Sequence, residues 1–425
     1  MGLRFVMVTT FYPPYNFGGD GTYVRRLAHA LLRRGHQVDV IHDADAYRVL
    51  SGKEPEPVVE PPGLTVHRLE SRLRTLSLLA TQQAGHPVVH GHRIKRLLDE
   101  GDYDVIHFHN VSLVGGPGVL AYGDAIKLYT AHEHWLVCPS HILWRHGREV
   151  CTGRECLTCV LKHRRPPQLW RQSNLLERMT EHVDTFCALS QFSADKHAEF
   201  GFPAPMTVVP SFLPDTPPLE GPVRRVHETP YFLFVGRLEK IKGLQDVIPH
   251  FGDDAPAELW IVGDGDYAPE LKRLAEGKRK VRFLGQRPPE SIPPLYRDAL
   301  ALVTPSVCYE VFPLVVLEAF KEATPIIARR LGPYPEIVDQ TGGGLLFHDP
   351  ASLQRALTAV AGDAALRARL GAAALAGFQA RWTEQVSLGR YFQLIREAAE
   401  KKGRRRVLDA LASAAHHDGP RAEAG

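Results

Sequence analysis

Two glutamates, Glu310 and Glu318, lie on either side of the point where an apolar helix is expected to begin, and seven residues separate them. A helix that starts at the carboxyl end of a strand offers free N–H groups and a positive dipole end to phosphate oxygens. A carboxylate in the preceding loop can accept the hydroxyl groups of a sugar, and one further along the helix can accept those of a ribose. The alternative for Glu318 is a solvated helix residue.

Two cations follow an earlier strand-like run, YFLFV. Arg237 and Lys242, together with Gly236, lie at the turn from this strand to the next helix. Fixed positive charge there suits a diphosphate, whose negative charge grows as it leaves a reacting centre. Near the N-terminus, Gly19 and Gly21 lie between the first strand and the first helix, where backbone N–H groups can approach a phosphate or a sugar. The alternatives are an ordinary surface charge pattern and a tight turn.

The elements that would position these residues are short β-branched runs that alternate with amphipathic helical stretches. Such alternation predicts parallel, doubly wound sheets. A proline-rich stretch without periodicity divides the runs into two sets and predicts a linker. The sequence therefore predicts an α/β fold of two Rossmann-like domains with a ligand in the cleft between them. The expected boundaries are an N-terminal domain over 1–211, a linker over 212–230, a C-terminal domain over 231–380, a helix over 381–408 that packs back on the N-terminal domain, and a disordered tail over 409–425.

Length and composition limit the classes of function. A chain of 425 residues exceeds one ordinary core, and 44% hydrophobic with 23% charged residues is typical of a soluble globular protein. The net charge of +3 gives no argument for a nucleic-acid partner. We see no apolar run of the roughly 18–20 residues that a membrane span needs and no targeting leader, so we expect a cytoplasmic location. The basic cluster over 401–406 is either a solvated helix end or a contact with an anionic membrane surface.

Taken in order along the chain, the glycine loop, the VGRLEKIKG turn and the paired glutamates resemble the retaining family-4 glycosyltransferases, which have the GT-B fold. The resemblance covers nearly the whole chain, and its most specific motif is Glu310 with Glu318. It implies transfer of a sugar from a nucleotide diphosphate sugar to an acceptor hydroxyl, with retention of anomeric configuration by front-face attack. The departing diphosphate would take the acceptor's proton, so neither a protein nucleophile nor a metal would be needed.

The resemblance also implies a role for each matching residue. Glu310 would contact the donor sugar, Glu318 the ribose, and Arg237 with Lys242 the diphosphate. His132, in YTAHEHW, would face the transferred sugar. The other implied donor contacts are Gly19, Gly236, Arg287 beside the nucleobase, and the N–H groups from Phe312 through Leu314 to Val315.

Three departures from the family pattern bear on the donor sugar more than on the fold. Pro313 follows the aromatic residue where the family usually has glycine, and proline removes one N–H donor. Ala323 stands in place of a usual glycine, and Gly332 with flanking prolines stands in place of a usual double glycine. Two other functions remain open: a nucleotide-sugar 2-epimerase of the same fold, and a non-catalytic sugar-binding subunit.

The acceptor is not indicated, and polysaccharide, lipid-linked and small natural-product acceptors all remain open. Its pocket would be built from variable N-terminal loops, such as 46–62, and from the cysteine-rich insert over 138–163. His107 and His109 lie at another strand end that faces the same cleft. One of them would help to bind the acceptor, or both are satisfied strand-end histidines.

Four cysteines, Cys138, Cys151, Cys156 and Cys159, fall within the insert. Four thiolates could ligate zinc tetrahedrally and close a loop that has little core of its own. The last three also match the C-x4-C-x2-C spacing of plant-type iron–sulfur proteins, and disulfides and free thiols remain open. We favour structural zinc, because a transferase has no evident use for electrons. A subset of the family is similar in this run, H-x-x-W-x-x-C-P followed by cysteines, so the insert is expected to brace the acceptor side.

Overall fold

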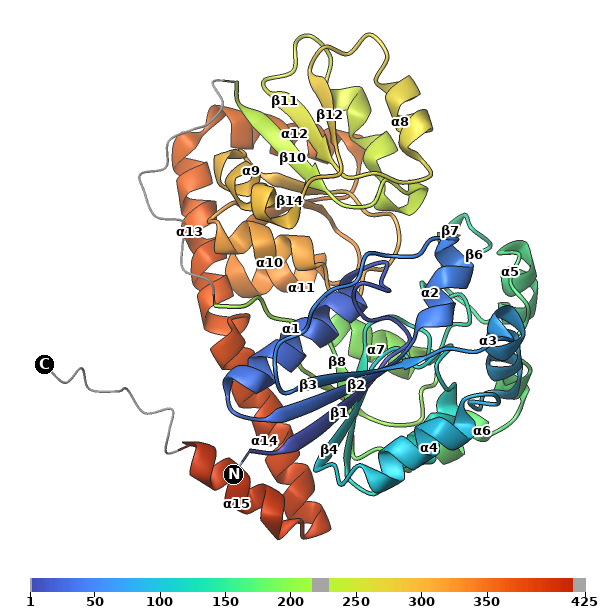
Figure 1. Ribbon diagram of the computed structural model, residues 1–425. Coiled ribbons are helices and arrows are strands. Elements are labelled where there is room, and N and C mark those ends of the chain that lie inside the picture. The colour runs from blue at the N-terminus through green and yellow to red at the C-terminus, as the bar shows by residue number, and fades with distance from the viewer. Residues whose placement is uncertain (1, 216–228, 416–425) are drawn as a thin grey trace, which may run out of the picture.

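Each half of the chain folds around one parallel sheet that is packed between helices (Figure 1). The computed structural model describes residues 2–215 and 229–415. The N-terminal sheet has the strand order β3-β2-β1-β4-β5-β8-β9, and the C-terminal sheet has the order β12-β11-β10-β13-β14-β15. In each sheet the order reverses beside the first strand, which is the doubly wound arrangement. The predicted α/β architecture of two Rossmann-like domains is therefore confirmed.

The strands of both sheets are short and mostly buried on both faces. In β1, Phe5 and Met7 belong to one apolar layer, whereas Val6 and Val8 belong to the layer on the opposite face. The N-terminal strands are β1 (Arg4–Val8), β2 (Gln37–Asp43), β3 (Leu64–Leu69), β4 (Val105–Phe108), β5 (Ile126–Ala131), β8 (Thr185–Ala188) and β9 (Met206–Val208). The C-terminal strands are β10 (Tyr231–Val235), β11 (Glu258–Val262), β12 (Val281–Gly285), β13 (Leu302–Thr304), β14 (Ile326–Arg329) and β15 (Gly344–Phe347).

Helices cover both faces of each sheet (Figure 1). The N-terminal helices are α1 (Gly19–Arg33), α2 (Ala44–Ser51), α3 (Arg74–Ala84), α4 (Gly91–Glu100), α5 (Cys156–Lys162), α6 (Leu175–Thr180) and α7 (Gln191–Glu199). The C-terminal helices are α8 (Ala268–Leu274), α9 (Ile292–Asp298), α10 (Leu314–Lys321), α11 (Tyr334–Thr341), α12 (Pro350–Gly362) and α13 (Ala364–Arg381). The cysteine-rich insert holds α5 and a small hairpin of β6 (Trp144–Arg145) and β7 (Glu149–Val150).

The last two helices, α14 (Glu384–Lys402) and α15 (Arg405–Ala415), lie against the N-terminal domain (Figure 1). Tyr391 and Ile395 share an apolar cluster with Phe5 of β1. The expected disorder from residue 409 is wrong for the described part of the tail, because α15 runs to Ala415 and buries Leu411 in that cluster. Residues 416–425 and most of the expected linker lie outside the described residues.

The basic cluster at the junction of α14 and α15 contacts acidic side chains of the N-terminal domain. Lys402 lies 2.7 Å from Asp184, Arg406 lies 3.3 Å from Asp102, and Arg404 also forms an ion pair with an aspartate. These ion pairs add to the apolar contacts of the C-terminal helices with the N-terminal domain, and contact with a membrane stays a prediction. No helix within 2–215 or 229–415 combines the length and the apolar character needed to cross a membrane.

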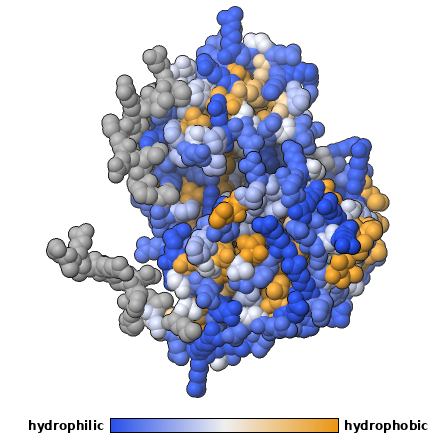
Figure 2. Space-filling view, in the orientation of Figure 1, coloured by the Kyte–Doolittle hydropathy of each residue, from blue (hydrophilic) through white to orange (hydrophobic). Residues whose placement is uncertain are grey.

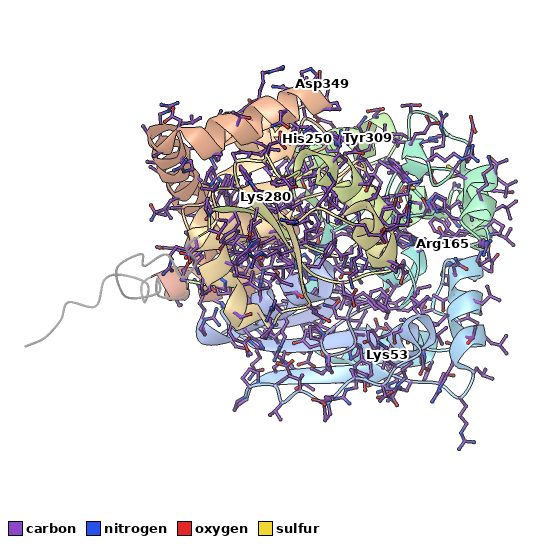
Figure 3. All side chains as sticks on the ribbon, turned by 90° about the horizontal axis from the view of Figure 1, so that it is seen from above. Lys53, Arg165, His250, Lys280, Tyr309 and Asp349 are labelled. Atoms are coloured by element: carbon purple, nitrogen blue, oxygen red, sulfur yellow. The ribbon has the colours of Figure 1, made fainter. Side chains whose placement is uncertain are left out.

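The two domains contact each other where α7 meets α11. The backbone N–H groups of Gln191 and Phe192, at the start of α7, donate to the Glu336 carboxylate over 3.1 and 3.0 Å. A carboxylate at a helix N-terminus is stabilised by the free N–H groups and the dipole. Beside it, the Tyr309 ring of the C-terminal domain, labelled in Figure 3, lies 5.1 Å from the Phe192 ring. The Lys196 ammonium of α7 lies 5.0 Å from the Tyr309 ring.

The visible surface is mainly hydrophilic, with apolar side chains gathered at the edge where α3 and α5 lie (Figure 2). These side chains include Leu76 of α3 and both Leu157 and Leu161 of α5, which are exposed. They lie outside the residues that line the interdomain cleft.

Candidate active site

A cleft of about 500 Å³ lies between the two domains. Residues that follow β1, β4 and β5 line its N-terminal wall, and residues that follow β10 and β13 line its C-terminal wall. The carboxyl ends of the strands are where doubly wound sheets bind ligands. The predicted residues that line the cleft are Gly19, His132, Gly236, Arg237, Lys242, Glu310, Phe312, Leu314 and Val315.

Lys242 and Glu310 form an ion pair in the C-terminal wall. The Lys242 ammonium donates to Glu310 Oε1 over 2.7 Å, and the Ser306 hydroxyl donates to the same oxygen over 2.7 Å. Burial lowers the pKa of Lys242, but the Glu310 charge outweighs burial and leaves the pKa above its ordinary value. Burial raises the pKa of Glu310, but Lys242 and Ser306 leave it below its ordinary value. Both groups are therefore charged at neutral pH.

Glycines permit two close approaches at the cleft. Gly263, after β11, has φ +133°, and a Cβ there would lie 1.9 Å from the carbonyl oxygen of Gly236. The ends of β10 and β11 meet at this place only because that Cβ is absent. At the start of α1, a Cβ on Gly19 would lie 3.2 Å from Leu314 at the start of α10. Two helix N-termini, one from each domain, therefore approach each other at the cleft.

Helix α10 begins with Pro313 as its N-cap residue. The missing proline N–H therefore falls at the cap position, and the first-turn N–H groups belong to Leu314 and Val315, which line the cleft. The departure at Pro313 leaves these two donors in place. Phe312 packs against Trp382, with the two ring centroids 5.9 Å apart.

Glu318 lies one turn into α10 and contacts both domains. Its Oε2 accepts from the Tyr296 hydroxyl over 3.0 Å, and its Oε1 lies 3.6 Å from the Arg26 guanidinium of α1. Burial raises the pKa of Glu318, although Arg26 and Tyr296 oppose this effect. Sequence reasoning missed Arg26, Tyr296 and Ser306, because these are common residue types far from any motif and only the fold brings them to the glutamates.

The two predicted arginines, Arg237 and Arg287, do not contact the Lys242–Glu310 pair through any described hydrogen bond or ion pair. The Arg237 side chain is 60% exposed, and its guanidinium lies 2.6 Å from a Glu239 carboxylate oxygen, so it is free to turn toward a ligand. Arg287 is exposed in the loop after β12 and is not one of the described residues that line the cleft. Its predicted contact with a nucleobase stays a prediction.

His132 follows β5 and is the outermost member of a chain of three histidines. His132 Nε2 lies 3.0 Å from Nδ1 of His109, and the His109 and His107 rings are 4.0 Å apart. His107 in turn contacts the Thr130 hydroxyl over 2.8 Å and the Tyr391 hydroxyl over 3.1 Å. Burial lowers the pKa of His132 to about 3, so its imidazole is neutral at pH 7. His107 and His109 are buried behind His132, which favours the structural interpretation of both.

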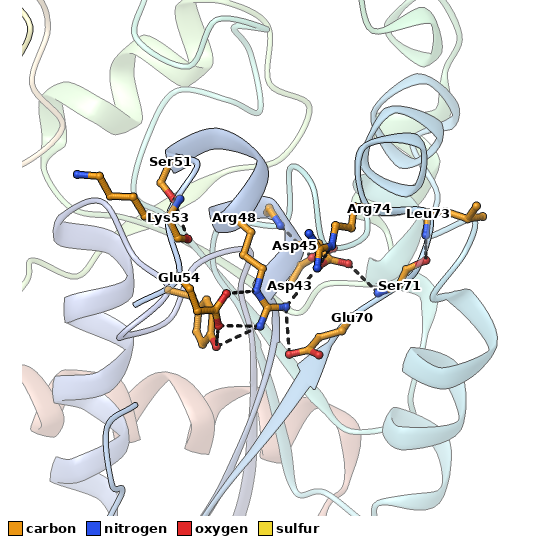
Figure 4. Close-up of polar contacts among 12 residues, drawn as sticks. Asp43, Asp45, Arg48, Ser51, Lys53, Glu54, Glu70, Ser71, Leu73 and Arg74 are labelled. Carbon is orange, nitrogen blue, oxygen red and sulfur yellow. Dashed lines mark hydrogen bonds and ion pairs between the residues drawn. The ribbon is translucent and has the colours of Figure 1, made fainter. Parts of the chain in front are cut away.

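The segment after α2, expected to contribute to the acceptor pocket, is held by Arg48 (Figure 4). The Arg48 guanidinium donates to Glu54 over 2.6 and 2.9 Å and lies 3.2 Å from Glu70. It also donates to the Tyr15 hydroxyl over 3.3 Å. This network fixes the segment against the loop that follows β1.

The prediction of structural zinc is not supported by the structure. The four thiols of the insert line one cavity of only about 20 Å³, and each of the six cysteines of the chain is free. Cys138 contacts the Ser140 hydroxyl over 3.2 Å, and Cys151 donates to the Gly153 carbonyl over 3.1 Å. In the described part of the chain, three or more metal-ligating side chains are nowhere grouped to hold an ion. A metal held by these thiols, whether zinc or an iron–sulfur cluster, is therefore not supported, and the six cysteines form no disulfide in the described structure.

Comparisons with known proteins identify the family. The model described as Glycosyltransferase Family 4 matches residues 17–215, and the model described as Glycosyl transferases group 1 matches residues 219–376. A D-inositol 3-phosphate glycosyltransferase of Corynebacterium jeikeium is 30% identical over 380 residues, which cover 83% of this chain and 86% of that protein. A glycogen synthase of Mycobacterium tuberculosis is 29% identical over 399 residues, which cover 88% of this chain and 89% of that protein.

Solved structures with the same fold cover nearly the whole chain. Sucrose-phosphate synthase from Thermosynechococcus elongatus has a TM-score of 0.69 at 21% identity, covering 93% of this chain and 98% of that one. The Anabaena protein HepE, in complex with UDP-glucose, has a TM-score of 0.62 at 17% identity, covering 94% and 99% of the two chains. The GT-B fold is thereby confirmed. The chain belongs to the family-4 glycosyltransferases and is a glycosyltransferase.

Proposed function

We propose that this glycosyltransferase retains the anomeric configuration of a sugar that it moves from a nucleotide diphosphate sugar to an acceptor hydroxyl. The observation that carries the proposal is the Lys242–Glu310 pair beside the first turn of α10, opposite His132 in the same cleft. This wall offers fixed positive charge and free N–H groups for a diphosphate. The Glu310 oxygens offer acceptors for the hydroxyl groups of the donor sugar.

The proposed reaction proceeds on one face of the donor sugar. The bond between the anomeric carbon and the diphosphate oxygen breaks, and the acceptor oxygen bonds to the same carbon from the same face. The acceptor's proton passes to the departing diphosphate. Lys242 stabilises the negative charge that grows on the diphosphate, because a fixed cation in a partly buried wall needs no rearrangement during the reaction. Arg237 joins it by leaving Glu239, and neutral His132 donates a hydrogen bond to the transferred sugar.

The donor class is supported by the structural neighbour HepE, whose structure holds UDP-glucose. We therefore propose a nucleoside diphosphate sugar as donor and UDP-glucose as the first compound to test. We also propose that catalysis needs no bound metal. Turnover in EDTA is then expected to equal turnover with added magnesium.

The experiment that tests this function has two steps. Thermal shift and calorimetry with UDP, ADP and GDP, and with their glucose conjugates, identify the nucleotide that binds. Mass spectrometry then analyses the products formed with a panel of acceptors. A product heavier by one glycosyl residue supports the transferase. An epimerised nucleotide sugar, or binding with neither product, would instead support the epimerase or the non-catalytic subunit.

A further inference from the structure

The N-terminal wall of the cleft carries two carboxylates. Asp20 lies in the first turn of α1, and Glu133 follows His132 after β5. Among the described residues that line the cleft, both cations, Arg237 and Lys242, belong to the opposite wall. The half of the cleft that faces the donor site is therefore acidic.

Several polar atoms of this wall lack a hydrogen-bond partner among the described residues. Glu133 Oε1 lies 2.7 Å from His141 Nδ1, yet within the described residues it has no hydrogen-bond partner of acceptable geometry. His134 lines the cleft with a fully buried side chain, and both of its ring nitrogens lack a partner in the described structure. The Asp20 carboxylate accepts a hydrogen bond from the Asn110 amide over 3.2 Å. Buried polar groups are normally paired, so Glu133 Oε1 and the two His134 nitrogens point to a ligand that would complete their hydrogen bonds.

The cysteine-rich insert supplies part of this wall. The His141 N–H donates to the Cys138 carbonyl over 2.9 Å, and the His134 N–H donates to the His141 carbonyl over 2.9 Å. This turn holds His141 at φ +76°, a conformation that is unfavourable for a residue with a Cβ. The turn brings the His141 imidazole to Glu133 in the cleft.

Two aromatic rings complete the wall. Phe11 and Phe17 both line the cleft, their ring centroids are 5.3 Å apart, and the Phe17 side chain is 42% exposed. An exposed aromatic face next to hydrogen-bond acceptors suits a ring with C–H groups on its faces and hydroxyl groups on its edge. Pockets that bind small molecules have this composition, apolar with a few convergent polar groups.

We propose that Asp20, Glu133 and His141 form the acceptor subsite, and that the part of the acceptor entering it is an uncharged, hydroxyl-bearing ring, a sugar or cyclitol without phosphate or carboxylate. The inference rests on the proposed function and names its acceptor class. The carboxylates accept hydrogen bonds from ring hydroxyls, whereas a phosphate would face two like charges. Burial raises the pKa of Asp20 and the Glu133 charge adds to this effect, so further negative charge at this place is unfavourable.

The test measures UDP release from UDP-glucose with a panel of uncharged sugars and cyclitols, each paired with its monophosphate. We expect uncharged members to be turned over with kcat/KM at least tenfold above that of their phosphates. Glu133→Gln and His141→Gly are each expected to raise the acceptor KM tenfold or more. His141→Gly removes the imidazole at a backbone conformation that suits glycine, so it separates loss of the side chain from misfolding. Glu149→Gln, on the exposed hairpin of the same insert, is the matched control and should leave acceptor KM unchanged.

A measurement of UDP binding distinguishes failure of the proposed function from failure of the proposed acceptor class alone. If wild-type protein binds no nucleotide, the proposed function fails and takes the subsite with it. If nucleotide binds normally, three results would each overturn the acceptor class alone. These are equal or better turnover of the phosphates, turnover of no uncharged member, and an unchanged acceptor KM in both Glu133→Gln and His141→Gly.

Discussion

The Lys242 ammonium and the Glu310 carboxylate lie 2.7 Å apart at the ends of β10 and β13, and the Ser306 hydroxyl donates to the same carboxylate oxygen. This arrangement holds the cation at one wall of the cleft before any ligand arrives. Fixed groups of this kind stabilise charge that develops during a reaction without paying for rearrangement.

Replacing Lys242 by methionine should therefore lower kcat by roughly 100- to 1,000-fold, the usual loss when one fixed donor to a developing charge is removed. Steady-state kinetics of donor turnover measure this loss. Lys240→Met is the matched control, because Lys240 is exposed in the same short helical turn, Lys240–Lys242. Equal kcat values for the two variants would remove Lys242 from the mechanism.

Glu318 should bind the ribose of the donor nucleotide. Glu318→Ala is expected to raise the Kd of UDP by roughly 10- to 100-fold, because a hydrogen bond to a charged group contributes about 1.5–3 kcal/mol. Calorimetry should be repeated with 2′,3′-dideoxyuridine diphosphate, which lacks the ribose hydroxyls. Wild type and variant should bind this analogue with similar affinity. A loss of the same size for both nucleotides would show that Glu318 acts on the protein, through Arg26 and Tyr296, and not on the ribose.

Replacing Ala323 by glycine should stabilise the folded protein. It follows α10 with φ +56°, a left-handed conformation that costs a residue with a Cβ about 1 kcal/mol relative to glycine. Ala323→Gly is expected to raise the free energy of unfolding by up to about 1 kcal/mol. The reverse change is Gly342→Ala, at a residue with φ +70°. The new Cβ would lie 3.8 Å from Ala373, which is an ordinary contact, so the variant should lower the free energy of unfolding by a similar amount. Denaturant unfolding of both variants measures this, and a destabilised Ala323→Gly would contradict it.

The buried histidines should make the fold sensitive to mild acid. Burial lowers the pKa of His36 to about 4 and the pKa values of His42 and His107 to about 3, below the ordinary value near 6.5. The unfolded chain takes up these protons as pH falls below 6.5, whereas the native chain stays neutral until about pH 4 or 3. These histidines therefore do not lower the free energy of unfolding above pH 6.5. Below pH 6.5, each of them lowers it by about 1.4 kcal/mol per pH unit.

Urea unfolding at pH 7.5, 6.0 and 5.0 measures this slope. His36→Asn should make the free energy of unfolding less dependent on pH, and His92→Asn, at an exposed position on α4, should keep the wild-type dependence. A free energy of unfolding that is constant from pH 7.5 to 5.0 would contradict the account.

The architecture could be predicted because many strands, such as YFLFV in β10, are short runs of apolar and β-branched residues, and several turns contain glycine or proline. These signals are local, and they are clear in parallel sheets because strands that are buried on both faces are apolar along their whole length. The motif residues could also be placed at the cleft, since Gly236 and Lys242 lie in the segment after β10, Glu310 lies in the segment after β13, and the carboxyl ends of parallel strands meet at one edge.

What could not be predicted depends on contacts between distant segments. Arg26 meets Glu318 only because α1 and α10 approach across the cleft, and no spacing encodes that meeting. The spacing of the four insert cysteines likewise counts residues along a loop and does not fix how their side chains are arranged, and the structure gives the zinc prediction no support. The helix α15 was missed because it begins in a basic cluster and precedes a polar end of the chain, and the packing of Val407 and Leu411 on the N-terminal domain depends on the fold.

The anomeric configuration of the product tests the central claim most directly. Wild-type protein is incubated with an α-linked nucleotide diphosphate sugar and an acceptor that it glycosylates, and proton NMR of the new linkage is recorded as it forms. Front-face transfer in the Lys242–Glu310 cleft predicts an α-linked product from the first turnover. A β-linked product would contradict it.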